Sequence, residues 1–184
     1  EDLIRELHDA TVGEVERLYH ITEKVKHVEH PVSCLKMGTV LYDMGLYDEA
    51  LEVLQTAVTK QSDYAEAYAV IGRSYAAKED YDQAETAFLS GLEYQPEYID
   101  LITHYGVLLS EKKDYEKAFG LLDAAIRDNA ENPTVHFAFA RALLHSLIHE
   151  VEEKLPPIEE RKEKINEHLD KVIAIDSDFS NESY

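Results

Sequence analysis

Residues 81–96 read YDQAETAFLSGLEYQP, a stretch with the pattern of one amphipathic helix. Its apolar side chains recur at helical spacing, at Tyr81, Ala84, Phe88 and Leu92. Gly91 lies inside this predicted helix, although an internal glycine costs roughly 1 kcal/mol relative to alanine. Pro96 then ends the helix. A helix that accepts such a glycine needs a compensating contact.

The same pattern recurs with a fixed period of about 34 residues, which is typical of a repeat array. YDEALEVLQTAV at 47–58 and YEKAFGLLDAAI at 115–126 align with YDQAETAFLSGL at 81–92. Small residues recur in fixed columns, namely Gly38, Gly72 and Gly106; Ala50, Ala84 and Ala118; and Ala57, Gly91 and Ala125. These columns predict places where helix backbones cross closely, so that close packing compensates for Gly91.

Each copy is predicted to form two helices. The first helices are expected at 32–44, 65–78 and 99–112, and the second helices at 47–60, 81–94 and 115–128. A fourth unit begins at Pro133, and its apolar pattern predicts an extended helix to about Lys154. Pro156 and Pro157 force a turn, after which a return helix is expected to run to about residue 175.

The sequence resembles the tetratricopeptide repeat (TPR) family. The family signature is an aromatic residue, Leu-Gly, Tyr, Ala-x3-Phe and Pro, and the second copy carries it in Tyr68, Ile71-Gly72, Tyr75, Ala84, Phe88 and Pro96. The resemblance covers 31–132, as units 31–64, 65–98 and 99–132. It implies an all-α, right-handed superhelix of antiparallel helix pairs. Residues 1–30 would form an N-terminal helical cap, with a degenerate extra repeat as the alternative. Residues 133–184 would form an elongated hairpin, as a degenerate fourth unit, with a C-terminal tail.

Composition restricts the partner and the chemistry. A net charge of −20 and a pI near 4.7 argue against duplex nucleic acid or an anionic membrane surface as the main partner. No apolar run is long enough for a membrane span, and the single Cys34 excludes an internal disulfide. No phosphate loop, nucleophile elbow or CxxC pair is present. We therefore expect a non-catalytic protein without a cofactor. The chain begins at Glu1 rather than at a methionine, which indicates a trimmed N-terminus, and a cytoplasmic location is favoured.

The resemblance also implies a binding surface, because in TPR arrays the first helices line a concave groove that receives an extended peptide or a helix. The corresponding residues here are Leu35, Lys36, Thr39, Tyr42, Ala69, Arg73, Ala76, Thr103, His104, Val107, Phe137 and Arg141. Apolar patches at the two ends with arginines between them suit an amphipathic helix or an extended segment with an occasional carboxylate. The alternative for the arginines is a solvent-facing role without a ligand.

One TPR subclass binds acidic chaperone tails through a clamp of Lys and Asn. The corresponding positions here are Leu35, Thr39, Val70, Asp100 and His104, so we do not expect that function. The predicted function is a protein-interaction scaffold. Two alternatives stay open: a self-associating assembly module and a secretion-type TPR chaperone.

A metal site formed by histidines is a weaker alternative for the function of this chain. His145 and His149 lie one turn apart, and His168 could approach them across the predicted hairpin. Two histidines at this spacing and a third ligand can hold zinc or nickel. The other interpretation is that these are polar residues beside the hairpin seam. We favour it and assign no metal.

Overall fold

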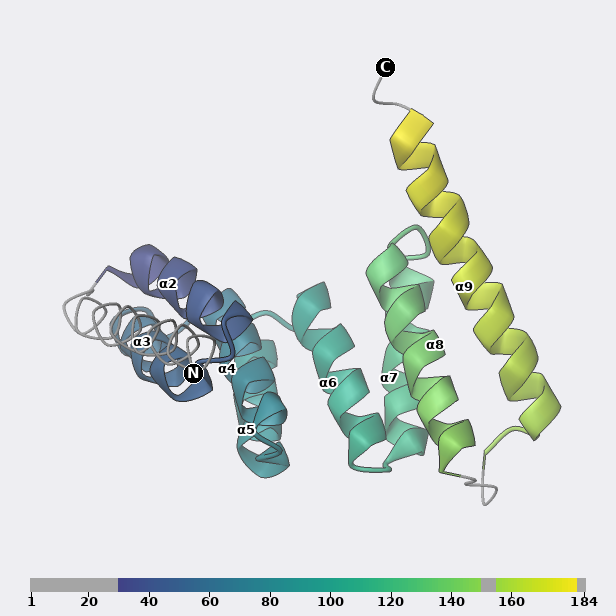
Figure 1. The fold of residues 1–184 in the computed structure, drawn as a ribbon, viewed down its shortest axis with the longest axis horizontal. Coiled ribbons are helices and arrows are strands. Elements are labelled where there is room, and N and C mark those ends of the chain that lie inside the picture. The colour runs from purple at the N-terminus through teal and green to yellow at the C-terminus, as the bar shows by residue number, and fades with distance from the viewer. Residues whose placement is uncertain (1–29, 150–154, 182–184) are drawn as a thin grey trace, which may run out of the picture.

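The computed structural model describes residues 30–149 and 155–181, and these residues form eight helices (Figure 1). The predicted all-α fold is confirmed, and the six helices predicted within 32–128 are present with each end within one residue. The predicted cap over residues 1–30 lies outside the described residues, apart from His30. The helices are α2 Pro31–Asp43, α3 Tyr47–Lys60, α4 Ala65–Ala77, α5 Tyr81–Tyr94, α6 Ile99–Glu111, α7 Tyr115–Asp128, α8 Pro133–Ile148 and α9 Ile158–Asn181.

Local sequence explains where helices begin. Pro31 and Pro133 occupy the first turns of α2 and α8, where a proline costs no intrahelical hydrogen bond. Before α8, the Asn132 side chain accepts a hydrogen bond from the Thr134 amide at 2.9 Å. This cap satisfies one of the amides that the first turn leaves without a helical partner.

The three turns inside the repeat units share one backbone conformation. Gly45, Glu79 and Lys113 have φ angles of 77°, 61° and 64°, and they occupy equivalent positions in successive units. After Gly45, the Leu46 amide donates a hydrogen bond to the Leu41 carbonyl in the last turn of α2, at 2.9 Å. The repeat therefore places a left-handed residue after each first helix, a position that favours glycine.

The glycine column of the first helices marks close helix crossings, as predicted. A Cβ added to Gly106 would lie 2.6 Å from Leu122 Cγ on the partner helix, and Gly38 and Gly72 face their partner helices in the same way. Any larger residue would push the two helices of a unit apart.

Gly91 has its own compensating contact. A Cβ at this position would lie 2.6 Å from Leu101 Cδ1 and 2.9 Å from Tyr68 Cβ. Tyr68 belongs to α4, the first helix of the same pair, and Leu101 belongs to α6, the first helix of the next pair. The glycine in the opening stretch thus lets α5 approach two helices at once.

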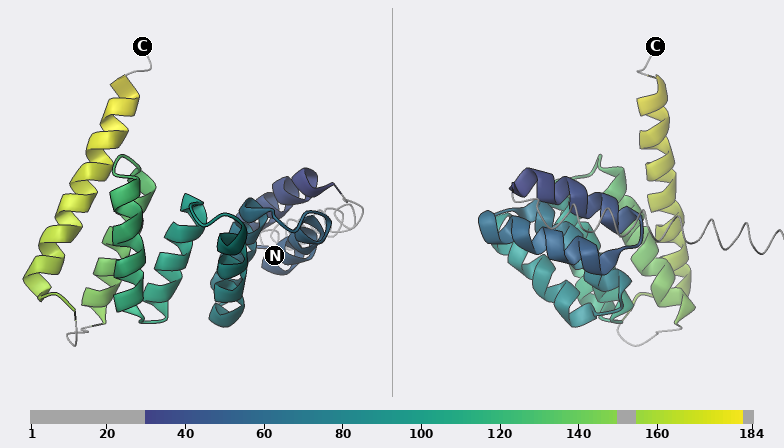
Figure 2. Two further views of the ribbon diagram at one scale, coloured as in Figure 1. Left: turned by 180° about the vertical axis from the view of Figure 1, so that it is seen from behind. Right: turned by 60° about the vertical axis from the view of Figure 1, so that its left-hand side comes forward.

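The helix pairs stack side by side (Figures 1 and 2). The first helices α2, α4, α6 and α8 contact one another in sequence along the stack. The apolar core follows the stack, and Tyr68 and Tyr75 pack against the buried clusters of both the first and the second unit. Each unit therefore completes the core of its neighbour. None of the described helices combines the length and apolarity needed to cross a membrane.

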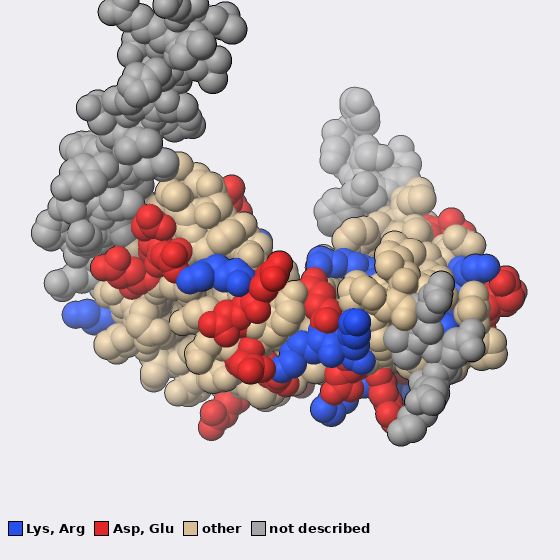
Figure 3. Space-filling model, turned by 60° about the horizontal axis from the view of Figure 1, so that its bottom comes forward, with Lys and Arg blue, Asp and Glu red and all other residues tan. Residues whose placement is uncertain are grey.

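Ion pairs also recur between units, each joining residues 30 positions apart: Lys78 with Asp48, Lys112 with Asp82, and Arg141 with Glu111. The first two connect the end of a first helix to the second helix of the preceding unit. In the view of Figure 3, basic side chains lie beside acidic ones, and no wide basic surface appears on that face. Such exposed pairs contribute little each, but they repeat with the units.

The fourth unit departs from the prediction. Helix α8 ends at Ile148, with His149 at its C-cap, rather than at Lys154. Its last turn is held by Arg161 of α9, which is 1% exposed and donates to the Ser146 carbonyl at 3.1 Å. A buried guanidinium suits the negative end of a helix. The return helix is present and extends to Asn181, beyond the predicted end.

Candidate functional site

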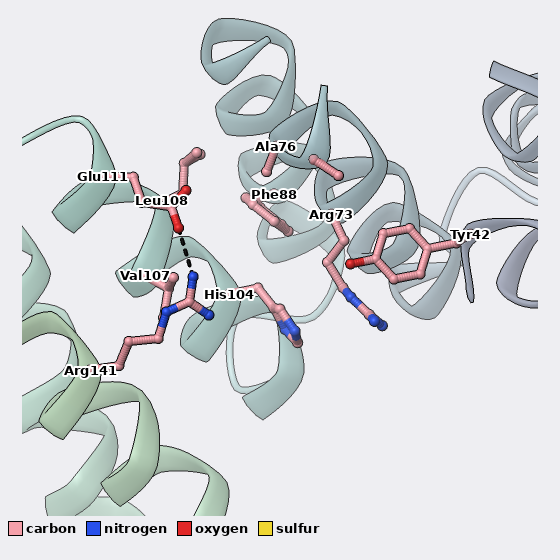
Figure 4. A pocket seen from close by; sticks show the side chains of 10 residues that line it. Tyr42, Arg73, Ala76, Phe88, His104, Val107, Leu108, Glu111 and Arg141 are labelled. Atoms are coloured by element: carbon pink, nitrogen blue, oxygen red, sulfur yellow. Dashed lines mark hydrogen bonds and ion pairs between the residues drawn. The ribbon is translucent and has the colours of Figure 1, made fainter. Parts of the chain in front are cut away.

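A small pocket lies where the first helices face one another (Figure 4). Its volume is about 190 Å³. Half of the predicted groove residues line it, namely Tyr42, Arg73, Ala76, His104, Val107 and Arg141. These residues come from α2, α4, α6 and α8, so all four first helices contribute side chains to the pocket. The remaining lining residues are Ala77, Phe88, Leu108 and Glu111.

The two arginines of the pocket are held differently. Arg73 lies over the Tyr42 ring, with 4.3 Å between its guanidinium carbon and the ring centroid, a cation–π contact. Arg141 donates to Glu111 at 2.7 Å, marked by the dashed line in Figure 4. No ion pair engages Arg73 among residues 30–149 and 155–181. One guanidinium therefore has a carboxylate partner, and the other is held by a ring.

His104 lies within the electric field of both arginines. Its Nδ1 donates to the Asp100 carbonyl at 2.6 Å, which leaves Nε2 as the acceptor in the neutral ring. Burial lowers the pKa of His104, Arg73 and Arg141 lower it further, and the Asp100 carbonyl opposes the shift. The pocket therefore favours the neutral imidazole, and negative charge that enters the pocket would favour its protonated form.

An exposed apolar stripe lies on α8. Phe137, Leu144 and Ile148 are 54%, 48% and 66% exposed. Their spacing of seven and four residues places them on one face of the helix, with Arg141 on the same face. Ile148 was not among the predicted residues, although it continues the same spacing by one turn.

The other predicted groove residues divide into two groups. Lys36 is exposed, and Leu35 and Thr39 are half-buried on α2. Ala69 and Thr103 are buried, and the Thr103 hydroxyl donates to the Ile99 carbonyl of its own helix at 2.9 Å. These last two side chains pack between helices and offer no surface to a partner.

The three metal candidates do not come together. His145 and His149 are neighbours, with 3.2 Å between their Nε2 atoms. His168 instead packs on His136, with 2.8 Å between the Nδ1 atoms, and edge-on against Phe139. Because α8 ends at Ile148, each position of α9 faces a residue nearer the start of α8 than predicted. No group of three or more metal-binding side chains occurs among the described residues.

Comparison with known proteins identifies the repeat. A family model described as "Tetratricopeptide repeat" matches residues 35–99 and 70–133, which together cover more than half of the chain. The chain belongs to the tetratricopeptide repeat family. The two matches overlap and together run from within α2 to the first residue of α8.

TPR arrays similar to this one occur in several other proteins. Mouse "Superkiller complex protein 3" is 30% identical over 102 residues, which is 52% of this chain but 6% of that relative. The crystal structure of MamA has a TM-score of 0.64 at 17% identity, covering 95% of both chains. The second TPR domain of human RPAP3, in complex with an HSP70 peptide, has a TM-score of 0.55 at 14% identity, covering 60% of this chain and 92% of that one. At these identities the two structures show a common fold alone.

Sequence reasoning missed two features of this pocket. Glu111, the partner of Arg141, lies on a first helix, whereas Asp48 and Asp82, the partners of Lys78 and Lys112, lie on second helices. The ion pairs of the earlier units therefore do not indicate it. The contact between Tyr42 and Arg73 joins α2 to α4, and the repeat pattern does not specify it.

Proposed function

We propose that this TPR protein is a non-catalytic scaffold whose concave groove binds a segment of a partner protein. The segment is an amphipathic helix or an extended peptide that presents apolar side chains and a single carboxylate. The observation that carries the proposal is the arrangement of Arg73, His104 and Arg141 around one pocket beside an exposed apolar stripe on α8.

The apolar stripe supports the first half of this chemistry. Phe137, Leu144 and Ile148 are exposed on the face that points the same way as the pocket residue Arg141. Exposed apolar side chains in a row provide contact for the apolar face of a helix or for alternate side chains of an extended segment.

The arginines support the second half. Arg73 has no carboxylate partner among the described residues, and Arg141 has one in Glu111. A ligand carboxylate can pair with Arg73 directly and compete with Glu111 for Arg141. With a net charge of −20, a strongly acidic ligand would be repelled by the rest of the protein. RPAP3 binds an HSP70 peptide, but Leu35, Thr39, Val70, Asp100 and His104 occupy the clamp positions here, which favours a less acidic ligand.

Site-specific photocrosslinking tests the proposal. A photoreactive amino acid replaces Val107 in the pocket or, as the matched control, exposed Glu116 on α7. Native lysate is irradiated with each variant, and the adducts are identified by mass spectrometry. We expect one partner to crosslink at position 107 and not at position 116, and the crosslink to be lost in the Arg73→Glu/Arg141→Glu variant.

Two results would contradict the groove assignment. One is a crosslink at position 107 that survives charge reversal in a variant shown by circular dichroism to stay folded. The other is capture at position 116 alone. Adducts that contain only this chain would favour the self-associating module, which sedimentation at several concentrations would then measure.

A further inference from the structure

A second pocket lies between the chain segment that precedes α6, helix α6 itself and helix α7. Its volume is about 430 Å³, and it shares no lining residue with the groove pocket. Its apolar residues are Ile102, Leu121 and Ala124, which are half-buried, and Ala125, which is buried. The pocket therefore has an apolar interior although it opens to solvent. The other lining residues are Pro96, Glu97, Asp128 and Asn129.

The repeat explains why this pocket is open. At the equivalent positions of the preceding unit, Tyr68 stands in place of Ile102 and Tyr94 in place of Asp128. These two tyrosine rings stack on each other, with centroids 6.2 Å apart and planes inclined by 17°. In the second unit a ring pair thus occupies the space that is empty in the third.

The unit that follows shows the same arrangement. His136 is the counterpart of Ile102 in the fourth unit, and it stacks on His168 of α9 with centroids 5.0 Å apart and planes inclined by 27°. In both neighbouring units, a planar side chain at the position of Ile102 is therefore stacked on a second planar group. Ile102 and Asp128 leave a space that is suited to a planar group from elsewhere.

The charges around the pocket indicate the chemistry of that group. Glu97 and Asp128 are exposed and line the pocket, and no ion pair engages either of them within the described part of the chain. The only amide side chain of the lining, Asn129, donates to the Ala125 carbonyl at 3.1 Å. The carboxylates of Glu97 and Asp128, next to apolar side chains, attract a ligand that combines a positive charge with an apolar stem.

We propose that this pocket binds an arginine side chain from a basic segment of a partner protein. The planar guanidinium occupies the place of the missing ring pair, and its methylene stem packs on Ile102, Leu121 and Ala124. Its N–H groups donate to Asp128 and Glu97. Arginine fits better than lysine because its head is planar, is more weakly hydrated and pairs with carboxylates through two parallel hydrogen bonds. This site is independent of the groove and recognises the opposite charge.

Nuclear magnetic resonance of the ¹⁵N-labelled chain tests the site with a defined probe. The probe is a short capped Gly-Ser peptide that contains one arginine, and the matched control peptide carries citrulline, which has the same shape without the charge. We expect millimolar binding of the arginine peptide, with the largest amide shifts at Glu97, Ile102, Leu121 and Asp128. The citrulline peptide should produce no such shifts, and a lysine peptide should bind more weakly.

Two variants separate the pocket from general attraction to an acidic surface. Ile102→Tyr/Asp128→Tyr rebuilds the ring pair of the second unit, so it should fold and should abolish the localised shifts. Asp128→Asn should weaken binding by about fivefold, the factor that corresponds to ~1 kcal/mol. The groove variant Arg73→Glu/Arg141→Glu should bind the arginine peptide as the wild type does.

Three outcomes would overturn the proposal. The arginine peptide could fail to shift these amides, or its shifts could spread evenly over the acidic surface. The third is an unchanged response after the ring pair has been rebuilt. None of these results bears on the groove, whose test is the crosslink at position 107.

Discussion

At the scale of single residues, the repeat keeps some backbone conformations even where the side chain has changed. Gly45 is followed at the same place in later units by Glu79 and Lys113, and all three have a positive φ. For a residue with a Cβ this left-handed conformation costs about 1–2 kcal/mol. The later units therefore carry a local strain that the first does not.

Replacing the strained residues should stabilise the protein. We expect Glu79→Gly and Lys113→Gly each to raise the free energy of unfolding by about 0.5–1 kcal/mol, because relief of strain exceeds the added freedom of the unfolded chain. Urea denaturation measures the change. The reverse replacement, Gly45→Ala, should lower the free energy of unfolding by a similar amount. A loss of stability in the two glycine variants would contradict this account.

The close crossing at Gly72 gives an opposite expectation. Its added Cβ would collide with the Phe88 ring, so Gly72→Ala should cost about 1–3 kcal/mol of stability. Gly120 provides the control because it is helical and an added Cβ would meet no atom within 4 Å. Gly120→Ala should stabilise by about 0.5–1 kcal/mol. Equal effects of the two changes on thermal unfolding would show that the crossing does not require glycine.

His104 should couple binding in the groove to pH. Its pKa lies below the ordinary value in the free protein, and a ligand carboxylate would raise it. Affinity should therefore increase by about fivefold as pH falls from about 8 to about 6, since the bound state takes up a proton. Isothermal titration of the captured segment measures this dependence. His104→Gln should remove it, and a flat profile in the wild type would argue against a carboxylate beside His104.

At the scale of helices, the attachment of α9 to α8 depends on a buried histidine pair. His136 Nε2 donates to the Ala130 carbonyl at 2.8 Å, so its Nδ1 accepts a hydrogen bond from the Nδ1–H of His168 at 2.8 Å. A pair with two protonated rings would place two N–H groups against each other. Burial lowers the pKa of His168, His136 and the side chains of Lys171 and Lys164 lower it further, and Glu167 opposes the shift.

This pair should make stability depend on pH. Because the folded pKa of His168 is lowered, the unfolded chain binds more protons, and stability falls as pH drops below about 6.5 toward the folded pKa. We expect a loss on the order of 1 kcal/mol between about pH 7.5 and about pH 5.5. Urea denaturation of the wild type and of His168→Gln gives the difference, which removes the contribution of the carboxylates. Parallel pH profiles of the two proteins would contradict the role of the pair.

The same helices show what the sequence could predict. The ends of α2 to α7 follow from three aligned copies, because each position has a counterpart with known spacing. The fourth unit has no such counterpart, and the apolar residues after Ile148 were read as more helix although α8 ends there. That error shifted the hairpin register and placed His168 beside His145 instead of His136.

The candidate site was also predictable only where its residues occupy equivalent repeat positions. The repeat positions of Arg73, Val107 and Arg141 are equivalent, so their common face could be inferred. Burial of Ala69 and Thr103 depends on how tightly neighbouring helices approach, and this distance is not encoded in the spacing of the repeat.

At the scale of the whole molecule, charge opposes compactness. The chain carries 38 acidic and 18 basic residues, so most acidic side chains have no basic partner to pair with. The recurring ion pairs between units are exposed and worth little. Mutual repulsion of the acidic residues should therefore outweigh them.

Salt should consequently stabilise the fold. We expect the melting temperature to rise by about 2–5 °C between about 50 mM and about 500 mM sodium chloride. The added salt shortens the distance over which the acidic side chains repel one another. Differential scanning calorimetry measures the change. A melting temperature that falls with salt would show that the pairs between Lys78 and Asp48 and between Lys112 and Asp82 dominate instead.

The empty place between Ile102 and Asp128 has a consequence for how such a chain can change over time. In a stack each unit touches only its neighbours, so the absence of a ring pair from the third unit leaves the Tyr68–Tyr94 and His136–His168 stacks as they are. Duplication thus provides spare copies of a structural contact. The equivalent position in one unit can then serve to bind a ligand, while the copies in the other units continue to stabilise the stack.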